Sequence, residues 1–375
     1  MTRFIIIIIA LSISLNLSAQ KRKTGRAYDA LEAGEYYDAI DLFKDAYSKT
    51  KERSEKAELT FMVAECYRLT NDPKNAETWY KKISGKEYAR PEATLRYAES
   101  LRKNGKYEDA INAYRDYKQL VPADARADLG IRSCELALEW MASPEPYQVD
   151  EIKDLTSRGS DFSPVFARDD YGMVYFTSSR DEATGKSEHG ATGQNFTDIF
   201  ESRLDKKEKW STPVPVEGIN TEYEEGTPSF TEDFREVYFT RCEAGKRENK
   251  GCVIYHARRE GEGWGDPEKL ELIADSLVAA HPAISPDGLS LYFVSQLSDG
   301  YGGKDIYVVR RENSNSDWKR PVNLGPDINT RGDELFPYVR QDGTLFLLPT
   351  VILAWVGLIF TGQSHSLTDR GWLKT

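Results

Sequence analysis

Histidine is scarce in this chain, and the sequence motifs of catalysis are missing. The four histidines follow no metal-site spacing and stand at His189, His256, His281 and His365. His281 directly precedes a proline, and we expect it to have a structural role. The chain also lacks the G-x-S-x-G elbow of hydrolases, the P-loop and the dinucleotide-binding fingerprint. We therefore predict no catalytic residue, no metal site and no cofactor, and a protein that is not an enzyme.

A surplus of basic residues is also missing. The chain has 50 Lys and Arg against 61 Asp and Glu, which gives a formal net charge of −11. Nucleic-acid binding depends on a positive surface that displaces counterions from the phosphates, so we expect no nucleic-acid partner. At 375 residues the chain is too long for one compact core, and we expect two or three domains.

Long apolar runs occur only near the two ends of the chain. The first, FIIIIIALSISLNL, follows Arg3 and precedes small residues that end at Ala19. This pattern is typical of a secretory signal peptide over residues 1–19. An uncleaved anchor is the alternative, although the run is short for a membrane span. Export would place the protein in the periplasm, where disulfides form. One version of this hypothesis also associates the protein with the outer membrane.

Cysteine is limited to four residues. Cys66 and Cys134 fall in helical patterns, where a small apolar side chain suits the core. Cys242 and Cys252 flank the polar loop EAGKRENKG and could face each other across a hairpin. The sequence leaves open whether this pair forms a disulfide.

Residues 23–143 contain a helical repeat. Three segments align, GEYYDAIDLF from Gly34, NDPKNAETWY from Asn71 and GKYEDAINAY from Gly105. Each turn residue is followed by an alanine and then an aromatic residue, which are Ala39, Ala76, Ala110, Phe43, Tyr80 and Tyr114. A small residue lets two helices approach closely, and the ring one turn later fills the groove between them. The pattern predicts stacked helix hairpins, with an unrelated helical bundle as the alternative.

This region resembles the tetratricopeptide repeat (TPR) in its period and at the small and aromatic positions. Asn71 departs from the pattern, since the other two copies have glycine there. The resemblance implies an α-solenoid whose groove binds a peptide or a partner protein. A further predicted helix, ARADLGIRSCELALEWMA at 125–142, would cap the solenoid, and a linker follows at 142–148.

From residue 148 the hydrophobic period changes to two, which predicts strands. Four copies of one pattern follow up to residue 346, and their prolines are Pro164, Pro228, Pro282 and Pro337. Each proline precedes a turn and a strand, and three copies continue to a tryptophan, at Trp210, Trp264 and Trp318. Repeats of about 50 residues with four short strands are typical of β-propeller blades.

The third copy resembles the WD40-like repeat of the TolB propeller. It has Ser285–Gly288, Tyr292–Ser295 and Asp305–Tyr307 in the places of S-P-D-G, Y-F-x-S and D-I-Y. The first copy has Asp198 in the place of Asp305, and the second copy departs from the pattern with Val253. We expect the two aspartates to hold a loop or a neighbouring backbone N–H. The predicted fold class is multidomain, α then β: a TPR α-solenoid followed by an incomplete WD40-like β-propeller of three blades and part of a fourth.

The loop SDGYGGKD at 298–305 allows a second interpretation of Asp305. Carboxylates such as those of Asp299 and Asp305 are hard oxygen ligands that suit calcium. The loop departs from the EF-hand pattern, however. We favour a simple blade loop over a metal site.

The second long apolar run, LFLLPTVILAWVGLIF at 345–360, falls where the fourth blade should continue. A shifted reading frame after Phe346 can restore, with permitted codons, a Gly-Gly, an Asp-Ile-Tyr and a Trp near the expected place. We therefore expect residues 347–375 to be an aberrant, out-of-frame tail of a truncated product. The alternatives are a transmembrane helix, for which the run is short and contains Pro349, and a buried hydrophobic strand or helix.

A helical repeat joined to a WD40-like propeller behind a signal peptide is similar to a family of Bacteroidota envelope proteins. In that family an OmpA-like peptidoglycan-binding domain usually follows the propeller, and members are associated with type IX secretion. The resemblance implies a non-enzymatic periplasmic scaffold. Its partners would be other envelope proteins, bound through the TPR groove and the propeller face, and peptidoglycan only through a domain absent from this chain. The alternatives are a prolyl-oligopeptidase-like hydrolase whose catalytic domain is lost, and a peptide- or carbohydrate-sensing module.

Overall fold

The computed structural model describes residues 24–86, 89–144, 150–185, 187–245, 248–274, 277–340, 342–349 and 358–360. The chain divides into two compact units, residues 1–148 with 188–194 and residues 149–187 with 195–375. The predicted signal peptide lies outside the described residues. Among the helices that the structure describes, none combines the length and the apolar character that a membrane span requires.

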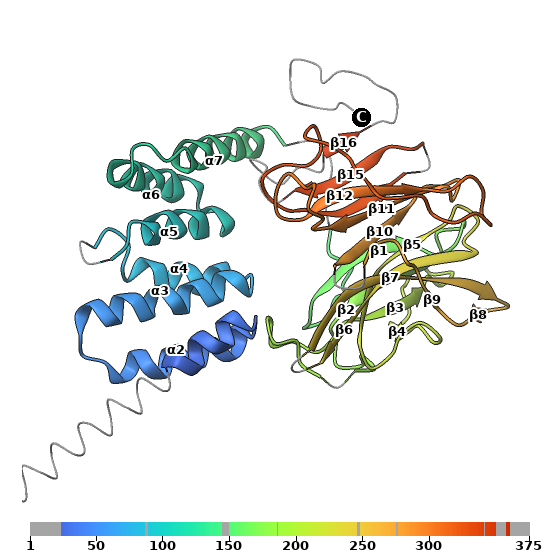
Figure 1. Ribbon diagram of the computed structural model, residues 1–375, viewed down its shortest axis with the longest axis horizontal. Coiled ribbons are helices and arrows are strands. Elements are labelled where there is room, and N and C mark those ends of the chain that lie inside the picture. The colour runs from blue at the N-terminus through green and yellow to red at the C-terminus, as the bar shows by residue number, and fades with distance from the viewer. Residues whose placement is uncertain are drawn as a thin grey trace, which may run out of the picture. The chain divides into compact units, whose positions relative to one another are not determined.

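The first unit is a stack of helices in which each one from α2 onward contacts the next along the chain (Figure 1). The described helices are residues 24–32, α2 (Tyr36–Lys49), α3 (Arg53–Leu69), α4 (Pro73–Lys81), α5 (Glu92–Lys103), α6 (Tyr107–Leu120) and α7 (Arg126–Ala142). This succession is the one that the predicted helix hairpins require.

The three predicted turn residues have left-handed backbone conformations. The φ angle is 78° at Gly34, 57° at Asn71 and 74° at Gly105. Asparagine adopts such angles more readily than most residues, so Asn71 can take the place of glycine. The helix α4 then begins at Pro73, and the side chain of Asp72 caps it by accepting a hydrogen bond from the N–H of Asn75 at 3.0 Å.

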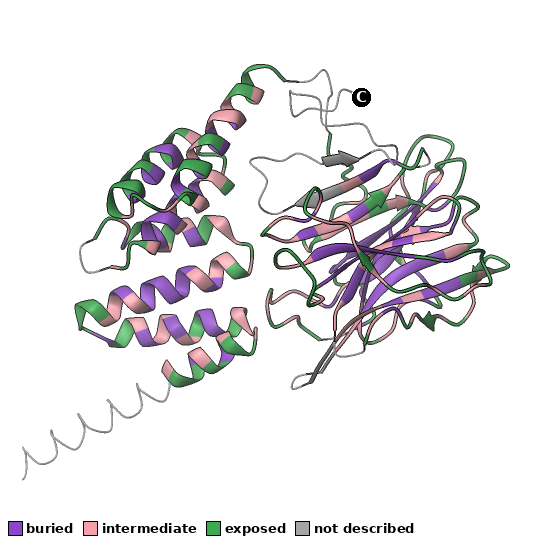
Figure 2. Ribbon diagram, turned by 45° about the horizontal axis from the view of Figure 1, so that its top comes forward, coloured by how far each residue is buried: buried purple, intermediate pink, exposed green. Residues whose placement is uncertain are grey.

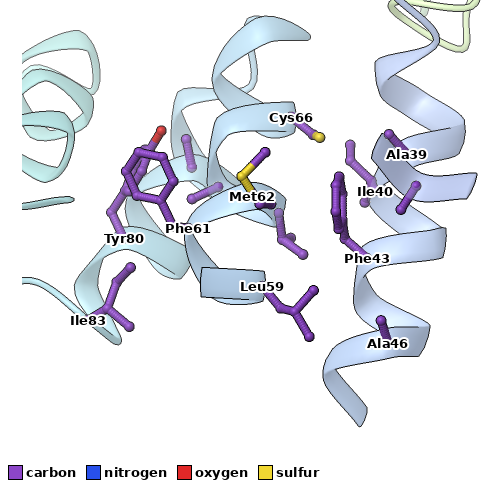
Figure 3. Packing of buried hydrophobic residues seen from close by; sticks show 14 of the residues in the cluster. Ala39, Ile40, Phe43, Ala46, Leu59, Phe61, Met62, Cys66, Tyr80 and Ile83 are labelled. Atoms are coloured by element: carbon purple, nitrogen blue, oxygen red, sulfur yellow. The ribbon is translucent and has the colours of Figure 1, made fainter. Parts of the chain in front are cut away.

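The repeat-defining side chains form the core of this unit. All six are buried, namely Ala39, Ala76, Ala110, Phe43, Tyr80 and Tyr114. Figure 3 shows Phe43 of α2 directed toward Leu59 and Met62 of α3. Tyr114 packs against α7 at Gly130, where a Cβ atom would lie only 2.3 Å from the ring atom Cζ. The absence of a side chain at Gly130 therefore lets the last helix cover the third repeat.

In the part of the second unit that the structure describes there are four antiparallel sheets, each made from consecutive strands. The first has β1 (Asp161–Phe166), β2 (Met173–Ser178), β3 (Asp198–Arg203) and β4 (Val214–Pro215). The second has β5 (Glu224–Phe230), β6 (Glu236–Gly245), β7 (Glu248–Glu260), β8 (Gly263–Trp264) and β9 (Glu268–Lys269). The third has β10 (Ala279–Ile284), β11 (Ser290–Ser295), β12 (Asp305–Arg310) and β13 (Val322–Asn323). The fourth has β14 (Glu334–Val339), β15 (Leu345–Pro349) and β16 (Leu358–Phe360).

Neighbouring sheets pack face to face as propeller blades do. The first strands contact one another in the order β1, β5, β10 and β14. One hydrophobic cluster joins the first sheet to the second, including Tyr175 and Phe239, and another joins the second to the third, including Tyr238 and Phe293. Figure 2 shows buried residues gathered along the strands of these sheets. The fold class expected from the sequence, TPR helices followed by WD40-like blades, is confirmed.

Each first strand has a bulge at the residue before its proline. The φ angles there lie between 50° and 53°, and the strand register shifts at the same place, at Ser163, Thr227, His281 and Phe336. The bulge turns a backbone N–H toward the preceding sheet. The N–H of Thr227 donates to Thr177 Oγ1 at 2.8 Å, and that of His281 donates to Thr240 Oγ1 at 2.9 Å. Pro228 and Pro282 therefore mark positions where one blade is bonded to the previous one.

The fourth sheet extends into the predicted tail. β15 pairs with β14 as far as Pro349, and β16 pairs with β15. Residues 350–357 and 361–375 lie outside the described residues. The hypothesis of an out-of-frame tail stays a prediction.

Candidate functional site

Asp198 and Asp305 each hold the loop that precedes their strand. The Oδ2 atom of Asp198 accepts the N–H of Thr184 at 2.7 Å, and that of Asp305 accepts the N–H of Tyr301 at 2.6 Å. Both aspartates are buried, and burial raises the pKa of Asp198. In the second sheet the same place is taken by Val253, opposite Arg241. Through these bonds the two aspartates organise the blades.

A second set of acidic residues, which the sequence analysis missed, stands at the start of the first strands. Each accepts hydrogen bonds from a Ser or Thr four residues earlier, in the pairs Ser157–Asp161, Thr221–Glu225 and Thr330–Glu334. Two of the acids also bind an arginine of their own sheet. Arg180 Nη2 lies 2.8 Å from Asp161 Oδ1, and Arg241 Nε lies 2.6 Å from Glu225 Oε1. The pattern S/T-x-x-x-D/E was the sequence signal for this set.

The three tryptophans stand in corresponding places, and two of them bridge neighbouring sheets. Trp264 Nε1 donates to the hydroxyl of Tyr175 at 3.3 Å, and the ring of Trp318 packs against Tyr238 with centroids 6.4 Å apart. Trp210 pairs with Leu204 through a β-bridge and packs on the cluster around Phe176. The regular tryptophan spacing therefore reflects packing between blades.

Cys242 and Cys252 are joined by a disulfide, with an S–S distance of 2.06 Å. They are directly opposed on β6 and β7. The equivalent strands of the first and third sheets end near this level, at Ser178 and Ser295. The disulfide therefore joins the two strands where the hairpin of the second sheet extends beyond the other blades.

The turns at one end of the second and third sheets enclose a cleft of about 660 Å³. Charged side chains line most of it, namely Glu232, Asp233, Arg235, Glu236, Arg258, Arg259, Asp287 and Arg311. Arg259 and Arg311 hold equivalent turns, because their Nε atoms donate to the carbonyls of Phe234 and Gly288 at 3.2 and 2.8 Å. Each guanidinium also lies over its sheet's tryptophan, with centroid distances of 4.4 and 4.6 Å.

Glu236 is the central charge of this cleft. Its Oε2 atom lies 3.3 Å from His256 Nε2 and 3.4 Å from Arg311 Nη2, and it accepts the hydroxyl of Tyr238 at 3.0 Å. Contact with His256 lowers the pKa of Glu236 to about 2, together with Tyr238 and Arg311 and against the effect of burial. The cleft is therefore a polar surface with a fixed carboxylate, suited to binding a charged segment.

Ion pairs connect the helices α3, α5 and α7. Arg96 of α5 lies between Glu65 of α3, at 3.7 Å, and Glu99, at 2.8 Å. Arg126 binds Glu92 of α5 with both terminal nitrogens, at 3.0 and 3.1 Å. Glu65 also accepts hydrogen bonds from Arg68 and from the hydroxyl of Tyr80. This network holds the helices of the second and third repeats in register.

Lys103 lies at the end of α5 beside the basic part of this network. Its side chain is exposed, and no ion pair to it occurs among the described residues. Desolvation and the positive charges of Arg68 and Arg102 lower the pKa of Lys103. A group of cations in this arrangement is stabilised by an incoming carboxylate.

The described part of the chain has no group of three or more His, Cys, Asp or Glu side chains that could hold a metal ion. In the loop at 298–305, Asp299 Oδ1 accepts the hydroxyl of Tyr307 at 3.0 Å, while Asp305 bonds to the backbone as described above. The Oδ1 atom of Asp299 and the Oδ2 atom of Asp305 therefore have different partners.

Comparison with known proteins assigns the helical unit. Residues 24–88 and 84–125 match the family model of the tetratricopeptide repeat. A comparison with curated proteins gave no match. Residues 24–125 are therefore a tetratricopeptide-repeat region, a kind of repeat associated with protein–protein interaction.

Solved structures resemble parts of this chain at low sequence identity. The Sgt2 TPR domain from Aspergillus fumigatus is 17% identical, over 36% of this chain and 89% of that one, with a TM-score of 0.29. A putative TolB from Agrobacterium tumefaciens is 16% identical, over 48% of this chain and 51% of that one, with a TM-score of 0.31. A puromycin-hydrolyzing peptidase from Mycobacterium tuberculosis is 16% identical, over 56% of this chain and 30% of that one, with a TM-score of 0.33.

Proposed function

We propose that this protein is a non-enzymatic scaffold of the cell envelope, which binds one protein through its TPR unit and another through its propeller unit. The observation that carries the proposal is the TPR match over residues 24–125. The buried repeat-defining residues support it, because they leave the exposed helix surfaces for partners. On the propeller unit, the charged cleft around Glu236 is the surface proposed to bind a partner.

Export to the periplasm is part of this proposal. The signal-like pattern of residues 1–19 supports it, and so does the disulfide between Cys242 and Cys252, since stable disulfides belong to oxidising compartments. Within the envelope, the likeness to TPR–propeller proteins of Bacteroidota favours a complex at the outer membrane, linked to type IX secretion. A link to peptidoglycan would depend on an OmpA-like domain of the kind that follows the propeller in that family.

The chemistry of the TPR partner is proposed from the charges around Lys103. Lys103 lies with Arg68 and Arg102 at the ends of α3 and α5. Arg68 is paired with Glu65, whereas Lys103 has no carboxylate partner among the described residues. An acidic peptide segment would supply the missing anion and lower the repulsion among these cations. We therefore propose an acidic partner segment at this position.

The test is a binding experiment with charge-reversed variants of the full chain. Wild type, Lys103→Glu and the control Lys74→Glu are immobilised and exposed to envelope extract. Lys74 is an exposed lysine of α4, so the control changes the net charge equally. A protein held by wild type and the control, and reduced at least tenfold with Lys103→Glu, supports the proposal. Equal recovery on all three would contradict the binding site at Lys103, and no recovery at all would contradict the scaffold.

A further inference from the structure

The junctions between neighbouring sheets have two corresponding positions that often carry an acid. One is the first residue of the third strand's D-I-Y pattern, and the other is near the start of the next sheet's first strand. The pairs at the three described junctions are Asp198 with Glu225, Val253 with Ala279, and Asp305 with Glu334. The same backbone hydrogen bond between the two sheets occurs at the first and third junctions. The N–H of Glu225 donates to Thr197 O at 2.8 Å, and that of Glu334 donates to Lys304 O at 2.7 Å.

The first two junctions avoid an unpaired pair of buried carboxylates in different ways. Glu225 is fully buried, and its carboxylate is paired with Arg241 at 2.6 Å. Its two oxygens also accept the hydroxyl and the N–H of Thr221 at 2.6 and 3.0 Å. The second junction, with Val253 and Ala279, has no acid at either place. Neither junction holds two carboxylates without a cation.

The third junction holds two buried carboxylates without a cation. Asp305 is 1% exposed and Glu334 is 0% exposed, and no ion pair to either one occurs in the described part of the chain. Asp305 Oδ1 and Glu334 Oε2 are buried and have no hydrogen-bond partner among the described residues. The same is true of the hydroxyl of Ser295, which is 0% exposed and directly opposite Asp305 in the register of β11 and β12.

Backbone hydrogen bonds between the third and fourth sheets place Glu334 beside Lys304, the residue before Asp305. Gly303 N–H donates to Gly332 O at 2.7 Å, Lys304 N–H donates to Asp333 Oδ1 at 2.8 Å, and the bond from Glu334 to Lys304 follows. Burial raises the pKa of Glu334, and the charges of Asp305 and Asp333 raise it further. The carboxylates are thus close enough to repel each other.

We propose that Asp305, Glu334 and Ser295 form a calcium site that joins the third and fourth blades. Carboxylate and hydroxyl oxygens are ligands of hard cations, and a divalent ion balances both negative charges. Calcium is favoured over magnesium, because magnesium retains several waters and these ligand atoms are out of contact with solvent. The remaining ligands would be backbone carbonyls of the glycine-rich loop beside Asp305, whose Tyr301 N–H already binds the other carboxylate oxygen.

Thermal unfolding of the purified full chain tests this site. The chain is freed of metal with EDTA and titrated with CaCl2, MgCl2 or NaCl at constant ionic strength. We expect calcium to raise the Tm of the propeller transition by about 5–10 °C at a hundredfold excess over Kd. Glu334→Gln should remove this response, and its Tm in EDTA should equal or exceed that of wild type. Asp198→Asn, the matched change at the first junction, should keep the full calcium response.

A second readout is independent of folding stability. Terbium, which occupies calcium sites and is sensitised by nearby tyrosine, should give luminescence with wild type and Asp198→Asn. Glu334→Gln and Asp305→Asn should lose it. If wild type shows equal Tm in EDTA and calcium while its Tm rises on acidification from pH 7 to 5, the two carboxyls share a proton and the proposal is wrong. A calcium response or terbium signal that persists in both variants would place the ion elsewhere and also overturn it.

Discussion

The backbone N–H of Phe336 donates a hydrogen bond to Nδ1 of His281 over 3.3 Å, and the two rings stack with centroids 4.2 Å apart. At the two preceding junctions the equivalent N–H binds the hydroxyl of Thr177 or Thr240. The corresponding residue of the third sheet is Val294, which has no hydrogen-bond acceptor in its side chain. The imidazole of His281 therefore supplies the acceptor that the valine lacks.

This bond makes the propeller sensitive to acid. Burial, and then the charge of Lys304, lower the pKa of His281 to about 4, from an ordinary value near 6.5. The unfolded chain therefore binds the proton first, so His281 contributes stability that is complete above pH 6.5 and is lost as the pH falls toward 4. We expect a loss of about 1–3 kcal/mol in the free energy of unfolding across this window.

Urea unfolding at several pH values measures this effect in two variants. His281→Asn tolerates the positive φ angle and keeps an acceptor without titrating, so its stability should fall less than that of wild type between pH 6.5 and 4. Thr227→Asn is the matched change at the preceding bulge and should keep the wild-type slope. Equal pH slopes in His281→Asn and wild type would contradict the assignment.

A methyl group at Gly130 should separate α7 from the third repeat. Because its Cβ would lie 2.3–2.6 Å from three ring atoms of Tyr114, Gly130→Ala forces the ring or the helix to move. We expect the helical unit to lose about 1–3 kcal/mol, measured by urea unfolding followed by circular dichroism at 222 nm. Gly25→Ala, in a helix and with open space at the Cβ, should be neutral or slightly stabilising. A neutral Gly130→Ala would mean that the α6–α7 contact is not formed as described.

Removal of Arg241 should leave a buried charge without its partner. The side chains of Arg241 and Glu225 are 10% and 0% exposed, so Arg241→Leu is expected to destabilise the propeller by about 3–5 kcal/mol. The double variant Arg241→Leu with Glu225→Gln removes both charges and should recover most of the loss. Arg203→Leu breaks an exposed ion pair with Glu201 and should change the free energy of unfolding by less than about 0.5 kcal/mol. A double variant as unstable as Arg241→Leu would show that the charge of Glu225 is not the cause.

The four cysteines should differ in reactivity. Burial raises the pKa of Cys66 to about 12 and that of Cys134 to about 11, so neither thiol should react with iodoacetamide in the native protein at pH 8. Unfolding without reductant should expose two thiols, and unfolding with reductant should expose four. Mass spectrometry counts the modified sites, and four reactive thiols without reductant would contradict the disulfide.

The same disulfide should stabilise the second blade. Its cysteines are separated by 10 residues, and closing such a loop in the unfolded chain is worth about 2–3 kcal/mol. We expect Cys242→Ser with Cys252→Ser to lower the free energy of unfolding by that amount. Treatment of wild type with reductant should give the same loss, whereas the double variant should be insensitive to reductant.

The sequence predicted the parts of the fold that depend on local repetition. Alanine and aromatic residues at fixed distances specify how one helix packs on the next, so Ala76 and Tyr80 identified a repeat even where Asn71 replaced glycine. The prolines and tryptophans of the blades were likewise visible, because each recurs at a corresponding position of the copies. The repeats are recognisable for this physical reason.

The bonds between blades could not be predicted in this way. Whether the glutamate is paired depends on the adjacent strand, since Arg241 is directly opposite Glu225 whereas Pro349 is directly opposite Glu334. Nothing within a few residues of either glutamate distinguishes the two cases. The use of His281 as an acceptor depends in the same manner on a valine in a different strand. The role of a residue that differs in one copy of a repeat can be recognised only when the copies are compared in the three-dimensional structure.

Each sheet of the second unit is formed by one uninterrupted stretch of chain, and no strand is lent to a neighbour among the described residues. Such a blade can be duplicated or deleted in a gene as a single cassette, since no other sheet loses a strand. The successive tryptophans, 54 residues apart, give the length of that cassette. Selection can then change the individual contacts at each junction between sheets, while the blades themselves are duplicated.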